Sequence, residues 1–227
     1  MSSLNLIYTL IMKWVFPNHC ISCTEKLDEG ILCNLCINQL EPTDGRDRLS
    51  EIFFPENIDK AFACWCFTDI LQEVIHHLKY SDRARVGKVL GQMAAVHLDN
   101  SAISSLDILT AIPLHPKKER ERGYNQALWI GKGLSEQVKI PFDASIIHRQ
   151  KYTVSQTMLD REERLQNMEN AFVTSRPLNG LKIVIVDDVL TTGATMSACA
   201  KKLKQNGAEQ VVAITLATPK IQKEKTS

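Results

Sequence analysis

The stretch from residue 182 to residue 216 contains the pattern that most restricts the fold of this chain. An apolar run over residues 182–186 is followed by a short polar loop, a helical stretch over residues 194–205 and a second apolar run over residues 211–216. A strand, a helix and a strand in such close succession imply a right-handed crossover between parallel strands in a sheet covered on both faces. We therefore predict an α/β fold with ligands bound at the carboxyl ends of its strands.

The polar loop between the first strand and its helix has the composition of a phosphate site. Two adjacent carboxylates, Asp187 and Asp188, follow the apolar run, and the helix then opens with Thr191, Thr192, Gly193, Ala194 and Thr195. Free N–H groups and the helix dipole at a helix start favour a phosphate dianion. The carboxylates repel phosphate and instead suit a cis-diol or a nearby magnesium ion. Together these groups describe a site for ribose 5-phosphate. Ordinary helix capping explains one aspartate or one threonine, but not this combination.

Four of the seven cysteines form two Cys-x-x-Cys pairs near the N-terminus: Cys20 with Cys23, and Cys33 with Cys36. Two such pairs on tight turns can offer four thiolates tetrahedrally to a structural zinc ion. A redox-active pair is the alternative interpretation, but two pairs in a short, loop-rich segment favour the metal. The odd number of cysteines argues against a secreted disulfide framework and predicts a reducing, cytoplasmic location. We interpret the other three as buried packing residues: Cys64, Cys66 and Cys199.

Turn-forming residues near position 45 divide the chain into parts. We predict an N-terminal helix and zinc ribbon over residues 1–45, the α/β domain over residues 46–220 and a flexible tail over residues 221–227. Residues 1–16 are too short and too interrupted to span a bilayer and lack the features of a signal peptide. They are either an amphipathic helix docked on the protein or a contact with a membrane surface or partner.

Apolar spacing within the larger domain predicts its remaining elements. Strands are expected at residues 61–67 and 107–112. Helices are expected over residues 70–78, 86–96 and 124–138, with Val96 on an apolar face.

Residues 183–195 resemble the binding motif of type I phosphoribosyltransferases. The resemblance implies a parallel sheet flanked by helices. It also implies that Asp187 and Asp188 engage the ribose hydroxyls and that residues 191–195 wrap the 5-phosphate of phosphoribosyl pyrophosphate. Magnesium would be held mostly by oxygens of the ligand.

Further segments look like those of the ComF family, in which a zinc ribbon precedes such a domain. They are Leu78-Lys79-Tyr80, Ile112-Pro113-Leu114-His115, Arg122-Gly123-Tyr124-Asn125-Gln126, Gln156-Thr157, Arg164, Asn167 and Ala171-Phe172. Two departures are Glu119 and Glu121, which alternate with cations, and Asn170, where the family often has glycine. ComF-like proteins are implicated in natural transformation. The resemblance implies binding of a phosphoribosyl ligand and incoming single-stranded DNA in the cytoplasm, alongside other proteins of the DNA-uptake machinery, without implying enzymatic turnover.

The residues themselves offer a DNA-binding segment, although the formal net charge of +1 provides no overall basic balance. Cations, one aromatic ring and amide donors suit a groove for a single strand: Lys117, Lys118, Arg120, Arg122, Tyr124, Asn125 and Gln126. A second set is Arg149, Lys151, Tyr152, Arg161 and Arg164. The alternative interpretation is a solvated helix face with pairs such as Lys117 with Glu121.

The rival function is a metabolic phosphoribosyltransferase that acts on a base or an amine. Such an enzyme needs backbone donors and cations beside the leaving pyrophosphate, and residues 113–117 are the candidate loop. No nucleobase pocket is recognisable from the residues, so the acceptor stays unnamed.

Overall fold

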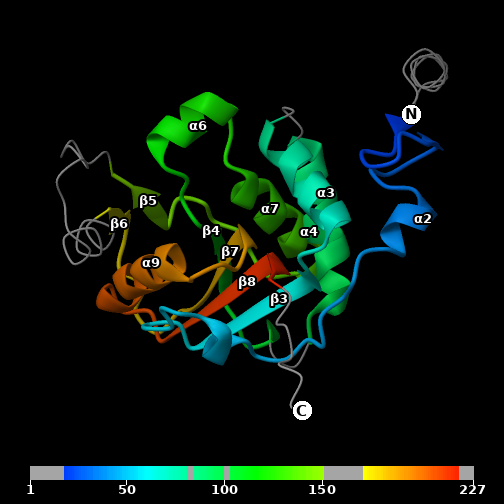
Figure 1. Ribbon diagram of the computed structural model, residues 1–227. Coiled ribbons are helices and arrows are strands. Elements are labelled where there is room, and N and C mark those ends of the chain that lie inside the picture. Colours follow the sequence, from blue (N-terminus) through cyan, green and yellow to red (C-terminus); the bar gives the residue numbers. More distant parts are fainter. Residues whose placement is uncertain (1–17, 81–83, 100–102, 151–170, 220–227) are drawn as a thin grey trace, which may run out of the picture.

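A four-stranded parallel sheet organises the computed structural model, which describes residues 18–80, 84–99, 103–150 and 171–219 (Figure 1). Its strand order is β3-β8-β7-β4, with every neighbouring pair parallel. The bounds are β3 Lys60–Cys66, β8 Gln210–Thr218, β7 Lys182–Val189 and β4 Ile108–Ala111. The predicted α/β fold is confirmed, and α9 (Ala194–Gln205) connects β7 to β8 as the pattern required.

The two faces of the sheet build two hydrophobic clusters. On β7, Val184 and Val186 join the cluster that includes α3 (Asp69–Tyr80), α4 (Ala84–Ala94) and α7 (Gln126–Val138), while Ile183 and Ile185 join the cluster of α9. This alternation follows from the period of two along a strand, and all four side chains are fully buried. Figure 1 shows α9 on one side of the sheet and the other three helices on the opposite side.

Several elements differ from the sequence predictions. Strand β7 continues through the two carboxylates because Asp187 and Val189 still pair with β8, so the aspartates lie within the strand rather than after it. Residues 116–122 form a helix, α6 (Pro116–Arg122), and a two-stranded antiparallel sheet of β5 (Ile147–Arg149) and β6 (Phe172–Thr174) was not predicted. The prediction for Val96 was wrong: α4 ends at Ala94, and Val96 in the following 3-10 turn η2 (Ala95–His97) is 80% exposed.

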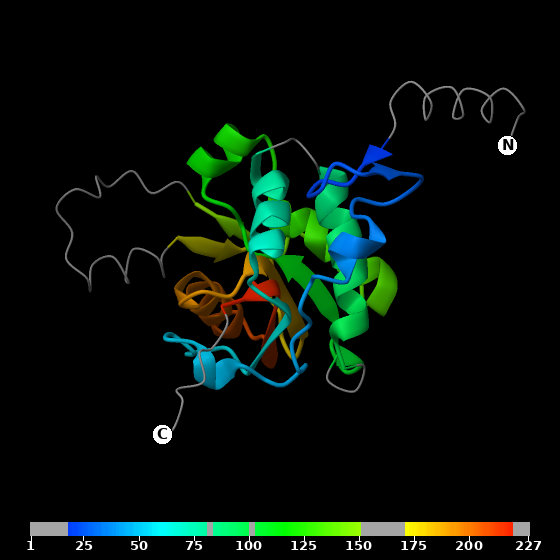
Figure 2. The ribbon, with the colours of Figure 1, turned by 45° about the vertical axis from the view of Figure 1, so that its right-hand side comes forward.

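The cysteine-containing segment consists of β1 (Asn18–His19), β2 (Lys26–Leu27) and α2 (Asn34–Ile37). Its apolar side chains belong to the same cluster as α3 and α4, and Figure 2 shows the blue segment against that side of the molecule. The chain then runs along β3, where the N–H of Thr43 donates to the Cys64 carbonyl at 3.0 Å. A 3-10 turn, η1 (Leu49–Glu51), follows before β3 begins.

Three predictions fall outside the described residues: the helix or surface contact over residues 1–16, the flexible tail over residues 221–227, and four members of the second basic set, Lys151, Tyr152, Arg161 and Arg164. Within the described part of the chain, every helix is too short or too polar to cross a membrane.

Helices α4 and α7 cross at glycines that let their backbones touch. A Cβ atom on Gly91 would lie 2.1 Å from the Ile130 carbonyl oxygen, and one on Gly133 would lie 1.9 Å from the Lys88 carbonyl oxygen. Both obstacles are helix backbone, which cannot turn aside as a flexible side chain can. The crossing therefore fixes the position of α7 relative to α4, and with it the position of Gln126, the first residue of α7.

We expect Gly91→Ala and Gly133→Ala each to lower the free energy of unfolding by about 1–3 kcal/mol because the helices must separate. Alanine has a higher helix propensity than glycine by about 1 kcal/mol, so propensity alone would make both variants more stable. A decrease in the free energy of unfolding would therefore show that the close helix contact dominates. Urea denaturation followed by circular dichroism measures the change. The control is Gln137→Ala on the exposed part of α7, and a stabilised Gly133→Ala protein would contradict the close crossing.

Candidate functional site

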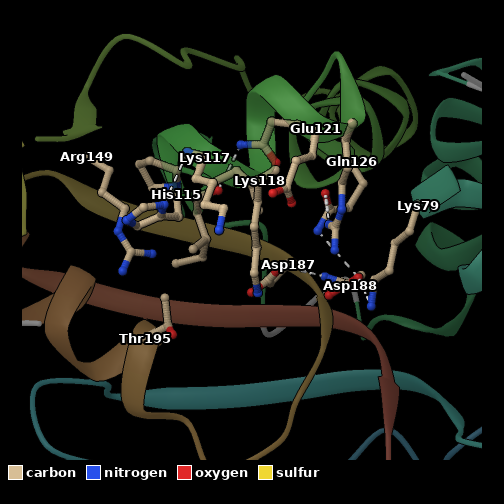
Figure 3. A pocket seen from close by; sticks show the side chains of 15 residues that line it. Lys79, His115, Lys117, Lys118, Glu121, Gln126, Arg149, Asp187, Asp188 and Thr195 are labelled. Carbon is tan, nitrogen blue, oxygen red and sulfur yellow. Dashed lines mark hydrogen bonds and ion pairs between the residues drawn. The ribbon is translucent and has the colours of Figure 1, made fainter. Parts of the chain in front are cut away.

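A cavity of about 540 Å³ opens at the carboxyl ends of β4 and β7. It is bordered by α6, by the starts of α7 and α9, and by β5 (Figure 3). Its lining includes both predicted ribose-binding acids and much of the predicted DNA-binding segment: Asp187, Asp188, Thr195, Lys117, Lys118, Arg122, Asn125 and Gln126. Lys79, His115, Glu121 and Arg149 also line it. The two sets of residues that the sequence analysis treated separately therefore share one site.

Asp188 is held by donors from two helices. The Nζ atom of Lys79, from α3, lies 2.8 Å from Asp188 Oδ2, and Gln126 Nε2 donates to the same oxygen at 3.5 Å. Gln126 in turn accepts from Arg122 at 2.8 Å. Asp188 is only 7% exposed, so these donors compensate a carboxylate withdrawn from water. Sequence reasoning gave no role to Lys79, which lies far from the aspartates along the chain.

Asp187 differs from its neighbour in its surroundings. Its Oδ1 accepts from the backbone N–H of Asp188 at 2.9 Å. Burial, and then the negative charge of Asp188, raise the pKa of Asp187 well above the usual value of an aspartate. A carboxyl group in this position gains from any hydroxyl or cation that approaches it, which is compatible with a diol ligand.

The loop before α9 is held by residues 52–56, a segment that no sequence motif connects with the site. The N–H of Phe54 donates to the Thr192 carbonyl at 3.1 Å, and Ser197 Oγ donates to the Glu56 carbonyl at 2.7 Å. Gly193 has φ of +79° and faces Ile52, whose Cγ2 would lie 2.0 Å from an added Cβ atom. Glycine is thus required by the backbone conformation and by Ile52. Thr191 and Thr192 are exposed, while Thr195 lines the cavity.

The residues of the predicted DNA-binding segment differ in exposure: the cations of α6 are exposed, whereas Tyr124 and Asn125 make contacts within the protein. Lys117 and Lys118 on α6 are exposed and line the cavity, whereas Arg120 is exposed outside it. The Tyr124 hydroxyl donates to the Leu78 carbonyl, and its ring packs against the core. Asn125 caps α7, accepting from the N–H of Ala127 at 3.0 Å and donating to the Ile112 carbonyl at 2.9 Å.

Positive charge gathers at the other end of the cavity. His115 accepts from the N–H of Lys117 at 3.2 Å through Nδ1. Burial and the surrounding cations, with Arg149 first among them, lower the pKa of His115. Figure 3 shows Arg149, His115 and Lys117 on one side, above Thr195, with Asp187 and Asp188 near the centre. An elongated ligand with anionic and hydroxyl groups fits this distribution.

The four paired cysteines converge: the Sγ atoms of Cys20, Cys23, Cys33 and Cys36 all lie within 4.8 Å of one another. Zinc–sulfur bonds of about 2.3 Å at tetrahedral angles place sulfurs about 3.8 Å apart. Burial raises the pKa of Cys36 to about 12, whereas backbone N–H groups outweigh burial and lower that of Cys20 to about 6. The cluster can hold a metal ion and is compatible with zinc. Cys64 and Cys199 are fully buried, as predicted, whereas Cys66 is only half-buried, which the prediction of a buried packing residue did not anticipate.

The chain is similar in sequence to a known domain family and to several named bacterial proteins. The family model described as phosphoribosyl transferase domain matches residues 125–227. The chain is 31% identical over 145 residues to the DNA utilization protein YhgH of Escherichia coli strain K12, covering 62% of this chain and 64% of that protein. It is therefore aligned with less than two thirds of that relative's length.

Two further relatives carry competence names. The chain is 27% identical to competence protein F of Haemophilus influenzae, over 67% of this chain and 70% of that protein. It is 26% identical to competence protein ComFC of Bacillus subtilis, over 87% of this chain and 82% of that protein. Among solved structures, glutamine phosphoribosylpyrophosphate amidotransferase from B. subtilis has a TM-score of 0.42 at 21% identity, covering 61% of this chain and 30% of that chain.

We expect purified protein to carry about one zinc ion per chain. Cys36→Ser should remove the metal and lower the melting temperature, because the cysteine segment shares its apolar cluster with α3 and α4. Elemental analysis and thermal denaturation test both statements. Cys66→Ser, outside the cluster, is the matched control and should keep the metal. Protein prepared without chelator and free of bound metal would refute the assignment.

Proposed function

The chain belongs to the ComF family, with a phosphoribosyltransferase-like domain, and on that premise we propose that it is a cytoplasmic competence protein that binds a phosphoribosyl ligand and single-stranded DNA. Relatives named for competence and DNA utilization support a role in DNA uptake. Other proteins of the uptake machinery are its proposed partners, and a structural zinc ion in the cysteine cluster completes the proposal.

The observation that carries the phosphoribosyl part is one cavity lined by Asp187, Asp188 and Thr195 together with cations. Thr195 lies in the first turn of α9, where N–H groups and the helix dipole attract a 5-phosphate. The aspartates suit the ribose hydroxyls. The cations near His115 suit a pyrophosphate, whose oxygens would hold magnesium.

The DNA part rests on the exposed cations of α6. Lys117, Lys118 and Arg120 can contact a phosphate backbone, and the net charge of +1 makes any such contact local. Because Lys117 and Lys118 also line the cavity, a phosphoribosyl ligand and DNA would use the same charges.

The alternative function is a phosphoribosyltransferase acting on a base or amine. It is supported by the cationic end of the cavity, where Lys117 and Arg149 can stabilise a leaving pyrophosphate. Consumption of phosphoribosyl pyrophosphate in the presence of one member of a panel of bases and amines would favour it.

Phosphoribosyl pyrophosphate with magnesium should raise the melting temperature, since a ligand at about a hundred times its Kd stabilises the folded state by about 2.7 kcal/mol. Asp187→Asn combined with Asp188→Asn should abolish the shift while keeping side-chain size. Thr195→Val should reduce it, and it avoids Gly193, where any side chain meets Ile52. Differential scanning fluorimetry gives the result, and an unchanged shift in the double variant would place the ligand elsewhere.

Single-stranded DNA should bind in preference to duplex, and its affinity should fall steeply with salt. Lys118→Ala should weaken both DNA binding and the ligand-induced melting shift, whereas Arg120→Ala, outside the cavity, should weaken DNA binding alone. Fluorescence anisotropy at several salt concentrations and the melting assay supply the two readouts. Loss of the ligand shift in Lys118→Ala with unaltered DNA affinity would favour the alternative function.

A further inference from the structure

Helix α3 contributes a lysine to the cavity from outside the phosphoribosyl motif. We infer that Lys79 is a positioning residue: it holds Asp188 in the orientation that a ligand diol requires. The inference rests on the proposed phosphoribosyl ligand and assigns a function to a residue that the motif does not contain.

The contacts distinguish the two aspartates. Asp188 Oδ2 lies 2.8 Å from Lys79 Nζ and accepts a hydrogen bond from Gln126 Nε2 at 3.5 Å. Asp187 Oδ1 instead accepts from the backbone N–H of Asp188. One carboxylate is therefore fixed by side chains of other elements, and the other by its own strand.

The position of Lys79 is itself well fixed. Its neighbour Leu78 is fully buried, and the Leu78 carbonyl accepts the Tyr124 hydroxyl just before α7. Nearer the start of α3, Glu73 Oε2 accepts from Ser22 Oγ of the cysteine segment at 2.7 Å. The side chain of Lys79 is 26% exposed, so its ammonium lies at the cavity wall and not in open solvent. Figure 3 shows it pointing toward Asp188.

The charge balance explains why a cation is needed at this point. Burial and the negative charge of Asp188 raise the pKa of Asp187, and the positive charge of Lys79 opposes that rise in part. The other ionisable groups that line the same cavity are His115 before α6, Lys117, Lys118, Glu121 and Arg122 on α6, and Arg149 on β5. The buried Cys199 thiol of α9 interacts electrostatically with Asp187. Without Lys79, Asp187 would take up a proton at higher pH and would accept hydroxyl donors less well.

The test is the affinity for ribose 5-phosphate, measured by isothermal titration calorimetry across the pH range in which carboxylates titrate. Lys79→Met should weaken binding about ten- to a hundredfold, the cost of losing charge-assisted hydrogen bonds. It should also move the loss of binding to higher pH, because Asp187 then takes up its proton at a higher pH. Lys79→Arg keeps the charge and should keep the wild-type pH profile. The titration of the ligand's own phosphate is common to all variants and cancels in the comparison.

The matched control is Lys88→Met, which removes a lysine paired with Glu136 at 2.6 Å outside the cavity. In an Asp188→Asn background, Lys79→Met should have little further effect on affinity if Lys79 acts through Asp188. Equal loss in both backgrounds, or an unshifted pH profile in Lys79→Met, would overturn the inference. If Asp187→Asn also binds like the wild type, the proposed ligand site itself is refuted.

Discussion

The position of the whole site depends on the parallel pairing of β7 with β8, which continues past the apolar part of β7. Asp187 pairs with Thr215 and Val189 with Ala217, so the backbone that carries the two carboxylates is fixed by the sheet. A loop in the same place would leave the acids free to separate. Because β7 lies between β8 and β4, its apolar residues 183–186 are fully buried, and the acids that follow them line the cavity at the ends of the strands.

The parts of the fold that follow from local sequence were predictable. Helix α9 spans the residues that the helical pattern indicated, and β3, β4 and β8 lie where the apolar runs placed them. The antiparallel pair β5–β6 was missed because its two strands are three residues each, separated by more than twenty residues in the chain. A strand that short has too few positions for an alternating pattern to be visible.

The missed part of the site consists of long-range contacts. Lys79 and Asp188 are brought together by the packing of α3 on the sheet, and Ile52 reaches Gly193 from before β3. Nothing in the local residue pattern at Lys79 or Ile52 indicates a partner more than a hundred positions away. The polar loop, by contrast, carries its chemistry within a few residues, so its composition could be interpreted without tertiary information.

Placing the cations of α6 on the cavity changes what the basic segment can do. Lys117 and Lys118 face a space that also contains Glu121, Asp187 and Asp188, so the field above the cavity is mixed in sign. A ligand bearing phosphates would neutralise Lys117 and Lys118, so that the exposed Glu119 and Glu121 of α6 would make the local potential more negative. A DNA backbone approaching α6 would then meet less attraction. Under the proposed function, occupancy of the cavity therefore opposes DNA binding by simple electrostatics, without any change in the fold.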